Sequence, residues 1–188
     1  MRLVRRSRSL AEPIVRAAMR TRRAVLGLAV LVPLALAPAM AGADEVLDQF
    51  QDWTAHTFTQ DGQKVCSMFS KPVKDEGDYT RRGAIWAFVV HRPTMNRSNV
   101  VSFEMGYPIK PDSTVSVEIG DRKFQLYTNG EGAFAWPEDD PKLVRAMRAG
   151  LDMVVRGISS RGTRTTDTYS LRGFTNAHNA INRACQVN

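Results

Sequence analysis

The segment STVSVEIGDRKFQLYT, residues 113–128, carries the clearest structural signal in the chain. Apolar and polar residues alternate along its first half, with Val115, Val117 and Ile119 on one phase. This period of two is typical of a strand with one buried face. A turn-forming Gly-Asp pair begins at Gly120, and the alternation resumes after it. The segment therefore predicts a β-hairpin and an antiparallel fold.

Short strand signals continue on both sides of this hairpin. An Asp-Gly pair at 61–62 separates two of them, which again predicts a tight turn. The polar stretch 71–83 predicts a solvated loop. The apolar run at 84–91 predicts a strand that is either covered on both faces or central in a sandwich. The further expected strands are 53–58, 64–70, 100–107, 151–159 and 165–171, and residues 129–136 predict a turn that leads to a short strand. Together they predict a mostly β fold, as an antiparallel β-sandwich or open barrel.

Two segments depart from this pattern and predict helices. Residues 138–150 form one short amphipathic helix, with Asp140 able to cap its first turn and a proline in the first helical position. Residues 174–185 have apolar side chains at helical spacing and predict a C-terminal helix. Thr175 is the expected cap of this second helix, and His178 is expected on its polar face.

Residues 1–43 have the layout of a secretory signal peptide. A cluster of arginines precedes the apolar run 24–36, and small residues that a signal peptidase accepts follow, with cleavage expected after Ala41 or Ala43. The apolar run is short for a membrane span, which needs about 20 residues. A retained anchor is the alternative. Because the preface before Met19 is unusually long, Met19 is an alternative start of translation. Either Sec or twin-arginine export fits the arginines.

The net positive charge of the chain comes from residues 1–43. The whole chain has 26 Lys and Arg against 19 Asp and Glu. Removing the eight arginines and the single acid of residues 1–43 leaves 18 charges of each sign. The remaining segment 44–188 is therefore formally neutral, and we expect no nucleic-acid partner. Its length suits a single β-rich domain with its own core.

The two cysteines, Cys66 and Cys185, lie near opposite ends of this domain. An even pair in an exported protein most simply forms a disulfide. Such a bond would fasten the C-terminal helix to the strand that carries Cys66, at a chain end that would otherwise fray. Two separate buried thiols are the alternative.

An ordered set of features makes the chain recognisable. These are Trp53, Cys66, the segment MGYPIKPDSTVSVEIGDRKFQLYTNGEGAFAW at 105–136, and the segment LVRAMRAGLDMVVRGISSRGTRTTDTYSLRGFTNAHNAINRAC at 143–185. The set resembles the invasion-associated locus B (IalB-like) family of exported proteins from Gram-negative bacteria. The resemblance covers nearly all of residues 44–188 and implies a mostly β domain in the periplasm or the outer envelope. It does not supply a molecular activity.

No catalytic or metal-binding motif is present in the sequence. The three histidines are scattered, without the spacing of a metal site, so we expect no metal or other cofactor. Ser159 or Ser160 with Asp167 and His178 could form a hydrolase triad, but the strained turn that usually presents a catalytic serine is missing. We therefore expect a protein that is not an enzyme.

Two sets of residues are candidates for binding. Arg161, Thr163 and Arg164 lie in the most donor-rich segment, which suits an anionic ligand or partner. An aromatic groove for a peptide or a glycan is the second candidate, with packing in the core as the alternative. Its lining would comprise Trp53, Trp86 and Trp136, with Tyr107 and Phe134.

The function expected from these features is contact with another protein, of the envelope or of a host surface, or with a surface component. A periplasmic small-ligand-binding protein with an aromatic-lined pocket is the alternative, and a hydrolase is the weakest hypothesis. No membrane span is expected after cleavage of the leader. The sequence does not identify the partner or the oligomeric state.

Overall fold

The computed structural model describes residues 44–187, and the signal peptide expected at 1–43 lies outside them. The described chain forms eleven strands, two α-helices and one short 3-10 helix. The strands are β1 Glu45–Phe50, β2 Trp53–Gln60, β3 Gln63–Ser70, β4 Lys74–Gly77, β5 Trp86–Arg92, β6 Arg97–Glu104, β7 Val115–Ile119, β8 Arg122–Asn129, β9 Gly132–Phe134, β10 Asp152–Ile158 and β11 Arg164–Ser170. The helices are α1 Asp140–Ala149, α2 Phe174–Cys185 and the 3-10 helix Pro93–Met95.

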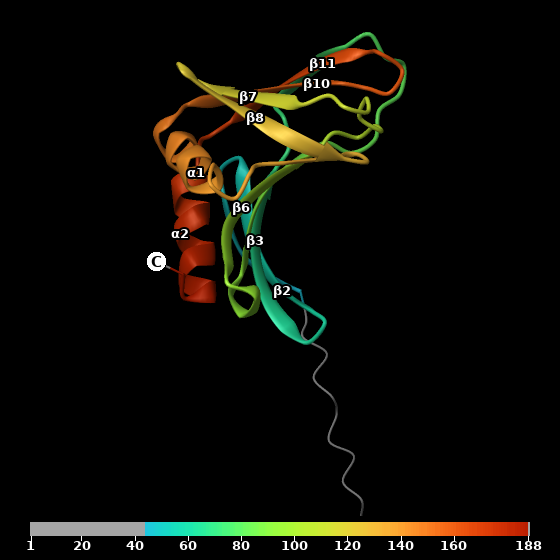
Figure 1. Cartoon of the computed structure of the whole chain (residues 1–188). Helices are drawn as coiled ribbons and strands as arrows, with labels where there is room; N and C mark the ends of the chain where they lie inside the picture. The colour runs from blue at the N-terminus through green and yellow to red at the C-terminus, as the bar shows by residue number, and fades with distance from the viewer. Residues whose placement is uncertain (1–43, 188) are drawn as a thin grey trace, which may run out of the picture. The chain divides into compact units, whose positions relative to one another are not determined.

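The eleven strands form one continuous antiparallel sheet in the order β1-β2-β3-β5-β6-β9-β8-β7-β10-β11-β4. Strand β8 pairs with both β9 and β7 and so joins two halves of the sheet. One half contains β7, β10 and β11, and the other contains β2, β3 and β6, with α2 lying alongside it (Figure 1). The predicted mostly β fold with one internal and one C-terminal helix is confirmed, as an open sheet with β1 and β4 at its edges.

The hairpin predicted at residues 113–128 is present as β7 and β8. Val117 pairs with Phe124 across it, and Gly120 has the positive φ of +55° that the turn requires. The β2–β3 turn is similar, because Asp61 and Gly62 both have positive φ, 52° and 74°. Two such residues match the right-handed twist of the flanking strands. Both turns therefore follow from local sequence.

The sequence predicted a loop over the polar stretch 71–83, but only part of this stretch is a loop. Its residues 74–77 form the edge strand β4, where Glu76 pairs with Thr166 of β11. All four residues of β4 are exposed. Short, charged strands of this kind discourage pairing with other chains at a sheet edge, and their lack of apolar alternation explains why the sequence pattern missed this one.

One apolar core lies under α1 and α2, and the inward faces of the strands build it. Trp53, Phe103, Met147, Tyr169 and Ile181 are among its largest buried side chains. The strand at 84–91 contributes only one face, because β5 alternates between buried and half-buried positions. Of the two alternatives predicted for this strand, coverage on both faces is wrong, while β5 does lie inside the sheet, between β3 and β6.

The C-terminal helix α2 is fixed at both ends. At the C-terminal end of the helix, Cys185 forms a disulfide with Cys66 of β3. At its start, the cap is Gly173 with φ +88°, where a Cβ atom would collide with the carbonyl oxygen of Phe50. Thr175 is not the cap, since its hydroxyl donates to the Arg148 carbonyl at 3.4 Å. Glycine is thus required where the chain passes close to β1.

Helix α1 is also started without the predicted side-chain cap. The Asp140 carboxylate does not bond to the helix but accepts a hydrogen bond from the backbone N–H of Val101 in β6, at 2.8 Å. Asp140 therefore ties α1 to the sheet, and its burial raises the pKa of its carboxyl to about 6.

Candidate functional site

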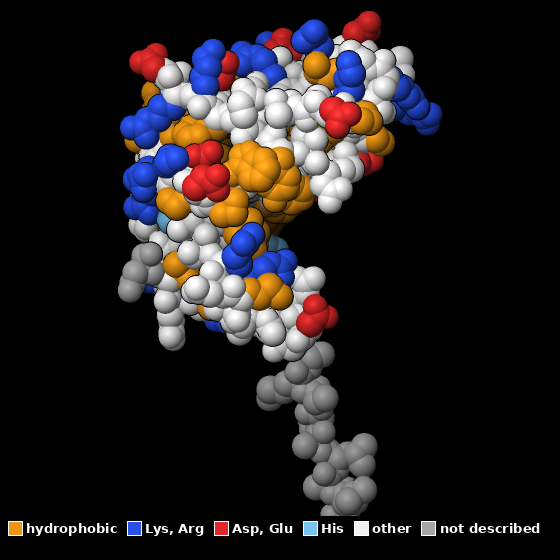
Figure 2. Space-filling model, in the orientation of Figure 1, with side chains coloured by type: hydrophobic (Ala, Val, Ile, Leu, Met, Phe, Trp, Pro, Cys, Tyr) orange, Lys and Arg blue, Asp and Glu red, His pale blue; other side chains and the backbone are white. Residues whose placement is uncertain are grey.

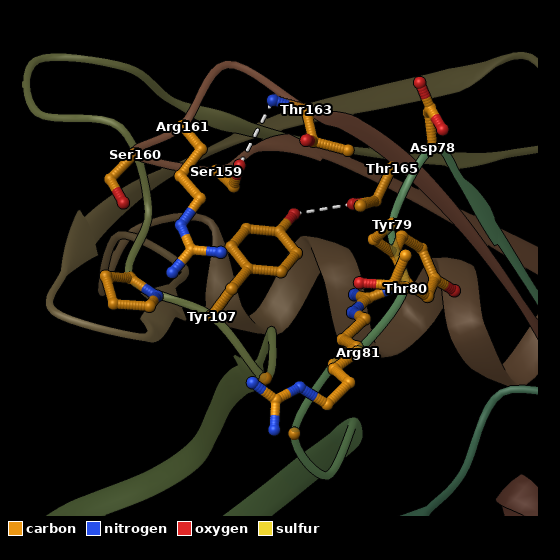
Figure 3. A pocket seen from close by; sticks show the side chains of 14 residues that line it. Asp78, Tyr79, Thr80, Arg81, Tyr107, Ser159, Ser160, Arg161, Thr163 and Thr165 are labelled. Atoms are coloured by element: carbon orange, nitrogen blue, oxygen red, sulfur yellow. Dashed lines mark hydrogen bonds between the residues drawn. The ribbon is translucent and has the colours of Figure 1, made fainter.

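A pocket of about 720 Å³ opens between three segments that are distant in the sequence. These are residues 78–83 before β5, residues 106–108 after β6, and residues 159–165 between β10 and the start of β11. Side chains from all three converge on the same space (Figure 3). Its volume falls within the range of small-molecule sites.

Two glycines set the base of this pocket. The backbone N–H of Gly83 donates to the carbonyl of Gly106 at 2.8 Å, and Gly106 has φ +69°. A Cβ atom on Gly106 would lie 2.7 Å from the carbonyl oxygen of Gly83. Only glycine suits this crossing. It positions the next residue, Tyr107, whose hydroxyl is 2.5 Å from that of Thr165 in β11.

A buried ion pair supports the pocket from below. The guanidinium of Arg82 makes two hydrogen bonds of 2.6 Å to the carboxylate of Asp167, and the two side chains are 4% and 0% exposed. Arg82 also donates to the Met105 carbonyl at 2.8 Å and lies 4.9 Å from the ring centroid of Tyr107. Burial works against the charge of Arg82, but the hydrogen bonds and charge of Asp167 raise its pKa overall. Its charge is therefore compensated within the protein.

Two other arginines of the pocket are uncompensated. Arg81 and Arg161 are exposed, and within residues 44–187 neither makes a side-chain hydrogen bond or an ion pair. Asp78 is the one acidic residue among those that line the pocket. Because Asp167 already neutralises Arg82, the pocket has a surplus of positive charge. Such a surplus favours an anionic ligand.

The structure separates the residues of the predicted anionic site. Arg161 and Thr163 line the pocket, but Arg164 does not. Thr165 is buried toward the pocket while Arg164 is exposed, and neighbouring residues of a strand point to opposite faces. The second arginine that lines the pocket with an exposed side chain is Arg81. It lies in the stretch 71–83, which the sequence predicted to be a solvated loop.

Trp53 and Trp136, two of the candidate tryptophans, have different surroundings. Trp53 is fully buried, its indole N–H donates to the Ser170 carbonyl at 2.9 Å, and its ring meets Phe174 edge-on. Trp53 is thus a core residue. Trp136 is 48% exposed and lies 4.6 Å, between ring centroids, from Tyr127.

Trp136 adjoins a row of aromatic side chains that crosses the sheet. Phe69 pairs with Phe88, and Phe134 pairs with Tyr127, while Ser102 lies between the two pairs. Directly opposed residues share one face of a sheet. Figure 2 shows hydrophobic side chains gathered between β8 and β6. The sequence contains this row, but its members are recognised only once the strand register is known.

A second pocket, of about 390 Å³, lies at the β3 end of this aromatic face. Phe69 and Trp86 are its aromatic residues, and their rings meet edge-on. Lys71 holds its ammonium 4.6 Å from the Trp86 ring centroid. The rest of the lining is mostly polar, including Gln49 and Gln51, and also contains Pro72 and Val73.

Two histidines that are distant in the sequence meet beneath α2. The rings of His91 and His178 are 5.8 Å apart, and both residues are buried. The Nδ1 atom of His91 accepts from the backbone N–H of Asn99, and the Nδ1 atom of His178 accepts from the Arg148 guanidinium at 2.9 Å. The sequence predicted His178 on the polar face of its helix. This prediction is wrong, because Arg148 and Asn99 cover His178.

Both imidazoles are held in the neutral form. Backbone N–H groups and guanidiniums only donate, so each Nδ1 is an acceptor and each proton sits on Nε2. Those Nε2 atoms face the side-chain oxygens of Asn182, at 2.8 Å, and Asn99, at 2.7 Å. Burial lowers the pKa of His91, and burial with the charges of His91 and Arg148 lowers that of His178 to about 4.

The residues of the weakest hypothesis, a hydrolase triad, do not meet. Ser159 and Ser160 line the large pocket and Asp167 is bonded to Arg82, whereas His178 contacts Asn99 and Arg148 beneath α2. Among residues 44–187, no cluster of three or more metal-ligating side chains occurs. The same part of the chain has no helix long and apolar enough to cross a membrane.

Comparison with known proteins agrees with the resemblance seen in the sequence. The family model described as invasion associated locus B (IalB) protein matches residues 53–182. The crystal structure of invasion associated protein B from Bartonella henselae is similar, with a TM-score of 0.55 and 20% identity. The similarity covers 74% of this chain and 96% of that one, and it shows a shared fold. No curated protein matches the chain. The chain belongs to the invasion associated locus B family.

Proposed function

We propose that this protein is exported to the periplasm or the outer envelope and acts there by binding, without catalysing a reaction. Its target would be a protein of the envelope or of a host surface, or another surface component. Membership of the family supports this proposal. So do the signal-like sequence of residues 1–43 and the Cys66–Cys185 disulfide, a bond that persists in oxidising compartments.

The observation that carries the proposal is the pocket with its two uncompensated arginines. A buried charge needs a compensating partner, as Asp167 is for Arg82. Arg81 and Arg161 instead present their guanidiniums at the rim of a preformed cavity. This arrangement suits recognition of an anionic group on a partner.

The test is a pair of matched variants of the exported protein. The double change Arg81→Ala/Arg161→Ala removes both uncompensated charges, and Arg164→Ala removes an exposed charge beside the pocket. We expect quantitative co-purification from envelope extracts to recover the same partners with the wild type and Arg164→Ala, and to lose them with the double variant. Equal recovery from all three proteins would contradict the site.

The absence of catalysis is tested separately. We expect purified protein to leave the covalent composition of envelope extracts unchanged by mass spectrometry. Turnover of any component that stopped with Ser159→Ala or His178→Gln would overturn this part of the proposal.

The second pocket favours one alternative, a periplasmic protein that binds a small ligand on aromatic side chains. Phe69 and Trp86 offer apolar surface there, and the side chains around them offer hydrogen bonds. A ligand that binds the native state raises the melting temperature by mass action. A thermal-shift screen in which Trp86→Ala abolishes a response and Trp136→Ala preserves it would support this alternative over the first.

A further inference from the structure

We propose that the arginine-lined pocket binds an anionic sugar, meaning a hydroxyl-rich ring that carries a carboxylate or a phosphate. This inference rests on the proposed binding function and names the chemistry that the pocket recognises. Three properties of its lining lead to this class: its charge, its hydroxyl content and the ring of Tyr107.

The charge requires an anionic group on the ligand. Arg81 and Arg161 come from different segments and make no hydrogen bond or ion pair with residues 44–187. Arg161 extends into the space beside the ring of Tyr107 (Figure 3). The guanidinium of Arg81 lies across the Tyr107 side chain from that of Arg161. A carboxylate or phosphate in the pocket would gain charge-assisted hydrogen bonds from either guanidinium.

The rest of the lining is unusually rich in hydroxyl groups. Thr80, Ser159, Ser160, Thr163 and Thr165 all face the pocket. The Ser159 oxygen accepts a hydrogen bond from the backbone N–H of Thr163 at 3.1 Å, so its own proton remains able to donate. The Ser160 hydroxyl has no partner among the described residues. Hydroxyls that both donate and accept complement the hydroxyls of a sugar ring, whereas a simple inorganic anion would use only donors.

Of the two tyrosines that line the pocket, Tyr107 is held in place by contacts on its ring and on its hydroxyl. The Tyr107 ring packs on the Arg82 guanidinium, 4.9 Å from its centroid, and its hydroxyl is tied to Thr165. The ring is only half-buried and borders the cavity (Figure 3). A flat aromatic face beside polar groups matches a pyranose ring, which has an apolar C–H face and a polar hydroxyl edge.

Binding by titration calorimetry at about 0.15 M ionic strength tests the ligand class with four probes. These are glucuronic acid, glucose 6-phosphate, glucose and inorganic phosphate, each added to the full exported protein. We expect both anionic sugars to bind at least tenfold more tightly than glucose or phosphate. Phosphate that binds as tightly as glucose 6-phosphate would overturn the proposal, as would the absence of binding by both anionic sugars.

Three variants locate the binding. Arg81→Gln/Arg161→Gln should reduce the affinity for both anionic sugars at least tenfold, and Arg164→Gln should leave it unchanged. Ser160→Ala should weaken glucuronic acid severalfold without changing the affinity for phosphate. All these side chains are exposed, so unchanged melting temperatures would show that the variants fold. An effect of Arg164→Gln equal to that of the double variant would refute the assignment.

The two proposals fail in different ways. If the anionic sugars do not bind but the Arg81/Arg161 variant still loses its envelope partner, the binding function stands and the ligand class is wrong. If neither the binding of the sugars nor the recovery of the envelope partner depends on Arg81 and Arg161, both proposals are wrong.

Discussion

Replacing His178 by glutamine should make the stability of the protein less sensitive to acid. His178 is 4% exposed, and its pKa is lowered to about 4 from a model-peptide value of 6.5. The charged and titratable groups that face it are His91 from β5 and Arg148 from α1. All its hydrogen bonds suit the neutral ring. Protonation would place a donor on Nδ1 opposite the Arg148 guanidinium.

The sign and size of the effect follow from linkage. The unfolded chain binds a proton at His178 below about pH 6.5, while the folded chain resists it until about pH 4. The contribution is therefore fully present above pH 6.5 and is lost as the pH falls. With about 1.4 kcal/mol for each pKa unit, the single site removes about 2 kcal/mol of unfolding free energy between pH 7.5 and pH 5.

Urea denaturation of the wild type and His178→Gln at pH 7.5 and pH 5 measures this loss. Asp140 acts in the opposite direction, because its raised pKa favours the folded state as the pH falls. The wild type and the variant share this contribution of Asp140 to the unfolding free energy, and to a first approximation they also share that of His91. The difference between the pH dependences of their unfolding free energies therefore isolates His178. We expect the wild type to lose about 2 kcal/mol more than the variant over this interval.

A second measurement on the wild type keeps the reasoning testable if the variant folds poorly. The ring C–H resonances of His178 should not titrate above about pH 5. Equal pH dependences in the two proteins, or a titration midpoint near 6.5, would refute a buried neutral imidazole.

Three further outcomes concern the framework. Cys185→Ser should lower the unfolding free energy by about 2–4 kcal/mol, because the bond to Cys66 closes a loop with a sequence separation of 119; denaturation and non-reducing peptide mapping check this. Asp167→Asn should cost about 3–5 kcal/mol by leaving the Arg82 guanidinium buried without its carboxylate, and a loss under 1 kcal/mol in urea would contradict that. Gly173→Ala should cost about 2 kcal/mol or more, through its positive φ and its contact with Phe50; an unchanged melting temperature would disprove this.

Local pattern was sufficient for most of the secondary structure. The alternation around Val117 predicted the β7–β8 hairpin, and the Asp61-Gly62 pair predicted the β2–β3 turn. The predicted helices match α1 and α2, with different caps. These features depend on residues within a few positions of one another. Strand β4 has no such signal, because its exposed residues are held only by pairing with β11.

Fold class, family and the pairing of the two cysteines were thus readable from the sequence alone. The pocket that Arg81 and Arg161 line was not. It joins Arg81 to Arg161 across 80 positions of chain and sends Arg164 to the other side of β11, and the burial of His178 likewise depends on Arg148 and Asn99. Periodicity shows that a strand or helix has two faces. Which segments cover each face is decided only when the strands pair, because the contacts that matter join residues far apart in sequence.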